Sequence, residues 1–270
     1  IDECTPFHVE REYTEASMHR THRWALRSLR EFIDHDDGSQ ALYGIVQGGI
    51  FPDLRKEAVA FVNNHPFFGI AVGGSLGADK GTMHAVVKET MTSIRRDRPV
   101  HLLGIGGISD IFHGVRQGID TFDCVQPTRL GRHGSALVKA KFWEEDKLEQ
   151  DQAECTTGSI GKKRLPQRQK PREHVKITKG QYRSDNRPID KDCGCPTCKD
   201  GYSRAYLQHL MKAGELLGGL LVSQHNVYFM NELMTAIRRA VREGTLDEEE
   251  KKWVAPGLRS WDFQTQEASA

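Results

Sequence analysis

The order of hydrophobic and polar residues in the first half of the chain predicts alternating helices and strands. Helical spacing runs through Met18, His22, Ala25, Leu29 and Phe32. Apolar strands are expected at 42–46, 68–72, 101–105 and 121–125, with helices at 52–64, 80–95 and from Ser109 to about Gly118. Unbroken apolar strands separated by helices are typical of a parallel sheet that helices cover.

The strand ends favour one kind of parallel sheet. Each expected strand runs into glycine or a polar residue, as at Gln47 and at Gly73-Gly74. In a (β/α)8 barrel this carboxyl edge carries the active site. An open doubly wound sheet is the alternative, and it is disfavoured because no G-x-G-x-x-G follows any strand. The prediction is an α/β fold of the (β/α)8, or TIM-barrel, type.

The character of the chain changes after about Leu130. Residues 144–192 are polar and basic, with little periodicity. Two helices are expected afterwards, Ser203 to Leu217 and His225 to Glu243, the second closed by Gly244. The acidic run 247–250 and the Gln/Ser-rich end are interpreted as a solvated tail.

Charge is unevenly distributed, although the formal net charge is only +1. Between Lys162 and Arg183 there are nine basic residues and one acid, Glu173, which gives 9 − 1 = +8 locally. A solvated loop and a contact with a polyanion explain this run about equally well, because clustered Lys and Arg displace counterions from phosphates.

Three of the six cysteines lie within six residues, in the pattern Cys193-x-Cys195-x2-Cys198. With His225 they offer three thiolates and one imidazole, enough to close a tetrahedral structural Zn²⁺ site. Soft sulfur ligands favour zinc over magnesium or calcium. His209 is a rival fourth ligand, and free cysteines are the plainer alternative.

The pattern also bears on location. Such cysteine spacing suits a metal ion better than a disulfide framework, which favours a reducing cytoplasm. No run of 18 apolar residues is present, so no membrane association is expected.

Asp123 is the candidate catalytic residue. It ends an apolar strand within Phe122-Asp123-Cys124-Val125-Gln126-Pro127-Thr128-Arg129. A carboxylate shielded there needs a charge partner or a chemical role. Taken alone, an Asp that caps the next loop is an equally good interpretation.

Six motifs in order make the chain resemble the tRNA-guanine transglycosylase (queuine tRNA-ribosyltransferase) family, over nearly its whole length. They are Asp2-Glu3-Cys4-Thr5-Pro6, Val46-Gln47-Gly48-Gly49, Ala71-Val72-Gly73-Gly74, Leu102-Leu103-Gly104-Ile105-Gly106, the segment from Phe122 to Arg129 continued by Gly131-Arg132, and the cysteine triplet with His225-Asn226.

The resemblance implies a (β/α)8 barrel with a zinc-binding subdomain inserted near its last strand. The chain matches the family's C-terminal portion, so the N-terminal strands are expected to be absent. Three parts follow: 1–132 as barrel, 133–224 as the inserted basic and zinc-binding subdomain, and 225–270 as C-terminal helix and polar tail.

The reaction that the resemblance implies is a base exchange in queuosine formation. Guanine at the anticodon wobble position of tRNA is replaced by a 7-deazaguanine, either the 7-aminomethyl base or queuine. Asp123 is implied as the nucleophile that attacks ribose C1′ and holds a covalent ribosyl intermediate, much as in retaining glycosidases. The enzyme is expected to be a cytoplasmic homodimer that binds tRNA.

The resemblance also implies the binding residues. Asp2 would accept from the purine N1–H and amino group, Gln47 and the Gly74 N–H would meet O6, and Leu103 would form an apolar wall. Cys4, Gly73 and Gly104 are expected in the same site. Loop capping is the alternative for Asp2 and Gln47.

Two arginines follow the candidate nucleophile. The resemblance implies that Arg129 and Arg132 hold the tRNA, and ordinary surface arginines are the alternative.

Three departures from the family pattern limit the expectation. The family's N-terminal segment, with Asp-Ser-Gly-Gly-Tyr and a second essential Asp, is not in this chain, so the chain alone is expected to be inactive. Gly77 stands where bacterial members that use the aminomethyl base usually carry Val, which would leave room for queuine. Residues 147–172 look inserted, with no role beyond their charge.

Two other readings stay open. A non-catalytic tRNA-binding or scaffold subunit of the same family is the first, and it is disfavoured because Asp123, Asp2 and Gln47 are all retained. An archaeal-type member acting at another tRNA position is the second. Such members usually carry an additional RNA-binding domain, whereas this chain ends in a polar segment.

Overall fold

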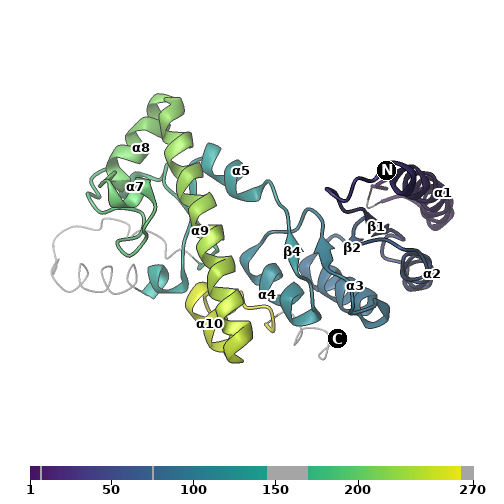
Figure 1. Cartoon of the computed structure of the whole chain (residues 1–270). Coiled ribbons are helices and arrows are strands. Elements are labelled where there is room, and N and C mark those ends of the chain that lie inside the picture. The colour runs from purple at the N-terminus through teal and green to yellow at the C-terminus, as the bar shows by residue number, and fades with distance from the viewer. Residues whose placement is uncertain (7, 75, 145–169, 263–270) are drawn as a thin grey trace. The chain divides into compact units, whose positions relative to one another are not determined.

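The computed structural model describes residues 1–6, 8–74, 76–144 and 170–262 (Figure 1). They divide into two compact units. The first comprises Ile1–Gly106 and Asp110–Cys124, and the second comprises Gly107–Ser109 and the described residues from Val125 onward. Within these ranges, no helix combines the length and apolar character that crossing a bilayer requires.

The first unit contains a parallel sheet covered by helices. Its strands are β1 (Tyr43–Val46), β2 (Gly69–Val72), β3 (Val100–Leu102) and β4 (Thr121–Phe122), paired in sequence order. The helices are α1 (Arg11–His35), α2 (Pro52–Asn63), α3 (Lys80–Ser93) and α4 (Ile108–Gln117). The expected α/β fold with a parallel sheet is confirmed. The four described strands do not test closure into a barrel, which stays a prediction.

One face of this sheet packs on the helices and forms the core of the unit. Side chains alternate along a strand, so every second residue faces the same side. Val46, Val72 and Leu102 are buried on the helical side, against α2 residues such as Leu54 and α3 residues such as Val87. Burial of these apolar side chains stabilises the packing of the helices on this face of the sheet.

The opposite face carries a continuous row of side chains from all four strands. Ile45 pairs with Ala71, Ala71 with His101, and His101 with Thr121 in the strand register. Asp123 is the first residue after β4, and its contact with His101 places it on the same side of the sheet as Thr121. The candidate nucleophile therefore lies one layer above His101 at the carboxyl edge of the sheet.

The second unit is mainly helical. It contains α5 (Gln126–Arg132), α7 (Pro196–Lys199), α8 (Arg204–Ala213), α9 (Leu216–Glu243), α10 (Leu246–Trp253), a short 3-10 helix η1 (Gly180–Tyr182), and the antiparallel pair β5 (Ser135–Leu137) and β6 (His174–Lys176). Its core includes Ile177, Ile189, Leu207 and Val222 together with Cys195. The division into three parts expected from the sequence stays a prediction.

Asn226 ties α9 to the start of this unit. Its side chain is fully buried. Its Oδ1 accepts from the Leu137 N–H at 2.8 Å, and its Nδ2 donates to the Pro127 and Ser135 carbonyls at 2.8 and 3.0 Å. One amide thus bonds three backbone groups, and its contacts with Leu137 and Ser135 are buried.

Gly131 allows α5 to lie directly against α9. A Cβ at this position would be 2.4 Å from Ser223 Oγ and 2.6 Å from the Ser223 Cα. Any larger residue would force the two helices apart, which explains a glycine between Arg129 and Arg132 on packing grounds alone.

Two sequence expectations about this unit are wrong. The last long helix begins at Leu216 and not at His225, and the preceding helix ends at Ala213, where Gly214 adopts a left-handed conformation. Gly218 and Gly219 lie within α9, where it meets Met211 and Arg132 at close range. Close packing therefore outweighs the low helix propensity of glycine.

The acidic run 247–250 is also not a solvated tail. It forms half of α10 (Leu246–Trp253), and Glu249 and Glu250 are buried. Glu250 accepts from the Ser260 N–H and hydroxyl, the latter at 3.0 Å, and Glu249 accepts from the Trp253 indole at 2.9 Å. Their partners come from later in the chain, so a local charge count could not reveal them.

We expect Asn226→Ala to lower the free energy of unfolding by about 2–4 kcal/mol, because three backbone groups lose this hydrogen-bond partner, two of them in buried contacts. Urea denaturation of the full-length protein followed by tryptophan fluorescence measures this. Asn231→Ala is the matched control, since Asn231 is exposed on the same helix and makes one bond to Val227 O. Equal effects of the two substitutions would contradict the assigned role.

Candidate active site and metal centre

A cleft of about 740 Å³ lies at the carboxyl edge of the parallel sheet in the first unit. It is lined by residues from the N-terminal segment and from the loops after all four strands. Among them are Asp2, Cys4, Gln47, Gly74, Leu103, Gly104 and Asp123. All seven are predicted from the sequence, whereas Gly73, also predicted, is not part of the lining.

The N-terminal segment reaches the cleft because Glu3 anchors it to α1. The Glu3 N–H donates to Thr21 Oγ1 at 3.0 Å, and the Tyr13 hydroxyl donates to Glu3 Oε1 at 2.6 Å. Arg20 also binds the Glu3 carboxylate. The Tyr13 hydrogen bond, and after it the contact with Arg20, lower the pKa of the Glu3 carboxyl. Asp2 and Cys4, on either side of Glu3, are thereby held at the cleft.

Asp123 accepts two hydrogen bonds on a single oxygen. Both His101 Nε2 and the Gly104 N–H lie near Oδ1, at 3.1 and 3.0 Å. The other ring nitrogen of His101, Nδ1, is 2.8 Å from Thr121 Oγ1. His101 was not singled out from the sequence, since its contact with Asp123 depends on the register between β3 and β4.

The expected shielding of Asp123 is not observed. Its side chain is 57% exposed, although it faces the cleft that Gln47, Gly74 and Leu103 also line. The apolar strand predicted for 121–125 ends at Phe122, so Asp123 already belongs to the loop. An accessible carboxylate in a cleft suits attack on a substrate better than a role within the core.

Asp2 and Gln47 form a hydrogen-bonding edge in the same cleft. Gln47 is buried, and its Nε2 donates to Asp2 Oδ2 at 2.7 Å. Because an amide nitrogen carries two hydrogens, one is left to meet an incoming acceptor, while Asp2 accepts from donors. Gly74 lies close to the Gln47 side chain. It adopts φ +79°, and a Cβ at this position would lie 2.4 Å from Gln47 Oε1.

Arg55 braces the loops that carry Gln47 and Gly74. The side chain on α2 is buried, and it donates to Gly49 O at 2.7 Å and to Gly73 O at 2.9 Å. Burial lowers its pKa to about 10, so it stays charged at neutral pH. Sequence periodicity assigned this position to a helix but gave no sign that its guanidinium binds strand-end carbonyls.

The cleft continues to an ionic group at the start of α3 and α4. Lys80 Nζ and His84 Nε2 lie 3.1 and 3.0 Å from Asp110 Oδ1, and the His84 ring stacks on His113. Burial alone would raise the pKa of Asp110, but the His84 hydrogen bond and the Lys80 charge lower it. Lys80 and Asp110 line the cleft. The sequence pattern did not predict this ionic group.

Gly77 does not leave the additional room for queuine that the sequence predicts. It has φ +119°, and a Cβ there would lie 2.6 Å from Thr82 Cγ2. A side chain would therefore collide with α3 instead of filling the cleft. The glycine is explained by its backbone conformation and by this close approach. Ser75, in the same loop, lies outside the described residues.

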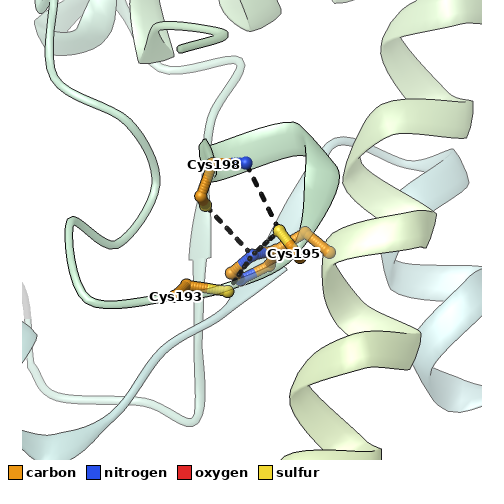
Figure 2. A group of neighbouring side chains, drawn as sticks. Cys193, Cys195 and Cys198 are labelled. Carbon is orange, nitrogen blue, oxygen red and sulfur yellow. Dashed lines mark hydrogen bonds between the residues drawn. The ribbon is translucent and has the colours of Figure 1, made fainter. Parts of the chain in front are cut away.

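The second unit brings Cys193, Cys195, Cys198 and His225 together as a candidate metal site (Figure 2). Their ligand atoms all lie within 4.8 Å of one another. The three sulfurs are 3.6, 3.5 and 3.5 Å from His225 Nδ1. A tetrahedral zinc site with ordinary bond lengths has sulfur–nitrogen edges of about 3.6 Å. The donors present therefore fit such an ion.

The surroundings prepare His225 to act as a ligand. Its Nε2 lies 3.0 Å from the Leu137 carbonyl, an acceptor that requires the ring proton on Nε2. Nδ1 is then left with its lone pair facing the sulfurs, as in metal sites whose second shell fixes the tautomer. His209 is exposed on α8 and is not in the cluster, which removes the rival ligand.

The crowded sulfurs differ in acidity. Hydrogen bonds from Cys193 and Cys198 lower the pKa of the Cys195 thiol to about 3, whereas the neighbouring sulfurs raise that of Cys198. The Cys195 thiolate thus forms easily, and a second negative charge on Cys198 is disfavoured. A cation among the three offsets this repulsion.

Comparison with known proteins decides the family. A family model described as queuine tRNA-ribosyltransferase matches residues 1–256. The chain belongs to this family. The resemblance found from six motifs is confirmed.

Curated relatives named queuine tRNA-ribosyltransferase agree with this assignment. The one from Roseiflexus sp. is 40% identical over 265 residues, covering 94% of this chain and 58% of the relative. Those from Protochlamydia amoebophila and Haemophilus influenzae are 40% and 38% identical, covering 90% and 92% of this chain but 54% and 56% of the relatives. The chain spans a little over half the length of these family members.

Two further expectations drawn from the family concern the second unit. Arg129 and Arg132 are exposed on α5, and their contact with tRNA stays a prediction. Of the expected insertion at 147–172, residues 147–169 lie outside the described part, as do the first four basic residues of the run from Lys162.

We expect Cys195→Ser to weaken metal binding by roughly 100-fold, since one of four ligands in a site worth about 10–16 kcal/mol is lost. Metal content per chain after dialysis against a mild chelator, measured by mass spectrometry, reports this. Cys124→Ser is the control, because Cys124 is a cysteine outside the cluster. If the Cys195 variant keeps one ion per chain, the assignment is wrong.

Proposed function

We propose that this chain carries the nucleophile and the base-binding edge of a tRNA base-exchange enzyme. In this proposal, the enzyme replaces guanine at the wobble position with a 7-deazaguanine. The observation that carries it is the shared cleft of Asp123, Asp2 and Gln47. Family membership supports the reaction class, and the cleft supplies residues of the right chemistry.

The base-binding edge suits a purine of the guanine type. Guanine and 7-deazaguanines present two donors, N1–H and the amino group, beside the O6 acceptor. Asp2 can take the two donors, and the remaining hydrogen of Gln47 Nε2 can reach O6. The Gly74 N–H is proposed as a second donor to O6, and Leu103 as the apolar wall of the ring site.

The exchange proceeds in two displacements at ribose C1′. In the first, a carboxylate oxygen of Asp123 bonds to C1′ while the C1′–N9 bond breaks and the departing guanine takes up a proton. In the second, the incoming base loses its proton and displaces the carboxylate. Configuration at C1′ is retained because each step inverts it. The nucleotide must leave its base stack to enter the cleft.

The metal ion is proposed to be zinc with a structural role. Three soft thiolates and one imidazole fill a tetrahedral site and leave no position for water or substrate. The ion would fix the loop around Cys193 and Cys195 to α9 through His225. Arg129 and Arg132 are proposed to bind tRNA phosphates near the modified nucleotide. Homodimer formation, a cytoplasmic location and inactivity of the isolated chain stay predictions.

Asp123→Asn is expected to lower the exchange of labelled guanine into tRNA by roughly 1,000-fold or more, because the covalent step loses its nucleophile. The full-length protein is assayed. Asp97→Asn serves as the control, since Asp97 is an exposed carboxylate paired with Arg95 in the same unit. Exchange by Asp123→Asn at the wild-type rate would refute the proposal.

The incoming base is expected to include queuine. The cleft volume lies within the range of about 300–1,000 Å³ that holds drug-sized ligands, which is compatible with a base that carries a bulky 7-substituent. Base incorporation into tRNA is measured with the 7-aminomethyl base and with queuine offered separately. Incorporation of the aminomethyl base alone would remove this expectation.

A further inference from the structure

We propose that His101 is a positioning residue that, together with the Gly104 N–H, engages Oδ1 of Asp123 and reserves Oδ2 for the bond to ribose. This inference rests on the proposed function, because it assumes that Asp123 is the nucleophile. It assigns different roles to the two carboxylate oxygens of Asp123. It also assigns a role to His101, which lies outside the proposed base-binding edge.

The sheet register places His101 where it can do this. His101 and Thr121 are direct partners across β3 and β4, and Asp123 follows Thr121 by two residues on the same face. The imidazole therefore spans from Thr121 to Asp123, with Nδ1 2.8 Å from the hydroxyl and Nε2 3.1 Å from Oδ1. Its side chain is 23% exposed, so it is more enclosed than Asp123 itself.

The chemistry of the partners sets the direction of the hydrogen bonds. A carboxylate only accepts, so the contact at Oδ1 requires a proton on His101 Nε2. In the neutral ring Nδ1 is then an acceptor, and the Thr121 hydroxyl can donate to it. Thr121 thus holds the ring in the tautomer and orientation that Asp123 needs, as an orienting group does for a catalytic histidine.

The two oxygens of Asp123 consequently differ. Oδ1 accepts from His101 and Gly104, whereas Oδ2 has no hydrogen-bond partner among the described residues. The hydrogen-bonded oxygen is the poorer nucleophile, so Oδ2 forms the bond to C1′ as the C1′–N9 bond breaks. Oδ1 then becomes the carbonyl oxygen of the ribosyl ester and keeps both donors.

The same donors act in the second displacement. When the incoming base attacks C1′, the C1′–Oδ2 bond breaks and its electron pair returns to the carboxylate. Hydrogen bonds already aimed at Oδ1 stabilise this developing charge without reorganisation. His101 is therefore expected to affect turnover and to leave binding of the base, at Asp2 and Gln47, nearly unchanged.

Two substitutions of His101 separate positioning from simple packing. In His101→Gln the side-chain NH2 lies near the place of Nε2 and can still donate to Asp123. In His101→Asn the shorter side chain leaves its NH2 near the place of Nδ1, within reach of Thr121 only. Both are amides, so they form a matched pair that differs in which neighbour is reached.

Guanine exchange is measured with the full-length protein, with kcat and KM for the base determined separately. His101→Asn is expected to lower kcat by about 100-fold, the usual effect of losing one such donor, with KM within about threefold of wild type. His101→Gln is expected to recover at least about tenfold of that loss. Equal kcat for the two variants, or a loss confined to KM, would overturn the inference.

Measurements on the Asp123 and His101 variants together distinguish a failure of the proposed function from a failure of this inference. Asp123→Asn that retains exchange overturns the proposed function and this inference with it. If Asp123→Asn is inactive and His101→Asn is fully active, the inference about His101 is wrong and the proposed function stands. Should neither His101 variant fold, Thr121→Val removes only the hydroxyl. It is expected to lower kcat several-fold at constant KM, and an unchanged kcat counts against the inference.

Discussion

The position of the Asp123 carboxylate depends on the parallel pairing of β3 with β4. That pairing sets His101 beside Thr121 and brings Asp123 within hydrogen-bond distance of His101 and of the Gly104 N–H. A shift of the register by one residue would turn Asp123 to the helical face of the sheet. The core contacts of Val100 and Leu102, which fix the register, therefore also determine whether Asp123 faces the cleft.

The second unit is organised around a different constraint. His225 and Asn226 are neighbours on α9, and one contacts the three cysteines while the other satisfies backbone groups next to α5 and β5. The metal site and the packing of α5 thus share one turn of one helix. Because Arg129 and Arg132 lie on α5, the same turn also supports the proposed tRNA contact. A metal ion held by His225 and the cysteines would therefore stabilise the same part of α9 that packs against α5.

Much of the fold and site followed from the sequence because it is encoded locally. Strand and helix order came from hydrophobic periodicity, and Cys193, Cys195 and Cys198 came from their spacing. What the sequence could not supply depended on distant partners. His101 needed the register of two strands, Arg55 needed the carbonyls of two loops, and Glu250 needed Ser260. Gly77 shows a further limit: the direction of a missing side chain is a property of the backbone, and here it faces Thr82.

The central claim is that Asp123 bonds covalently to ribose during the exchange. The most direct measurement incubates the full-length protein with tRNA, denatures it in acid, digests the nucleic acid and the protein, and locates the attached sugar by tandem mass spectrometry. A ribosyl adduct is expected on the tryptic peptide 117–129, at Asp123 and not at Asp120. An adduct on any other carboxylate, with Asp123 unmodified, would contradict the central claim.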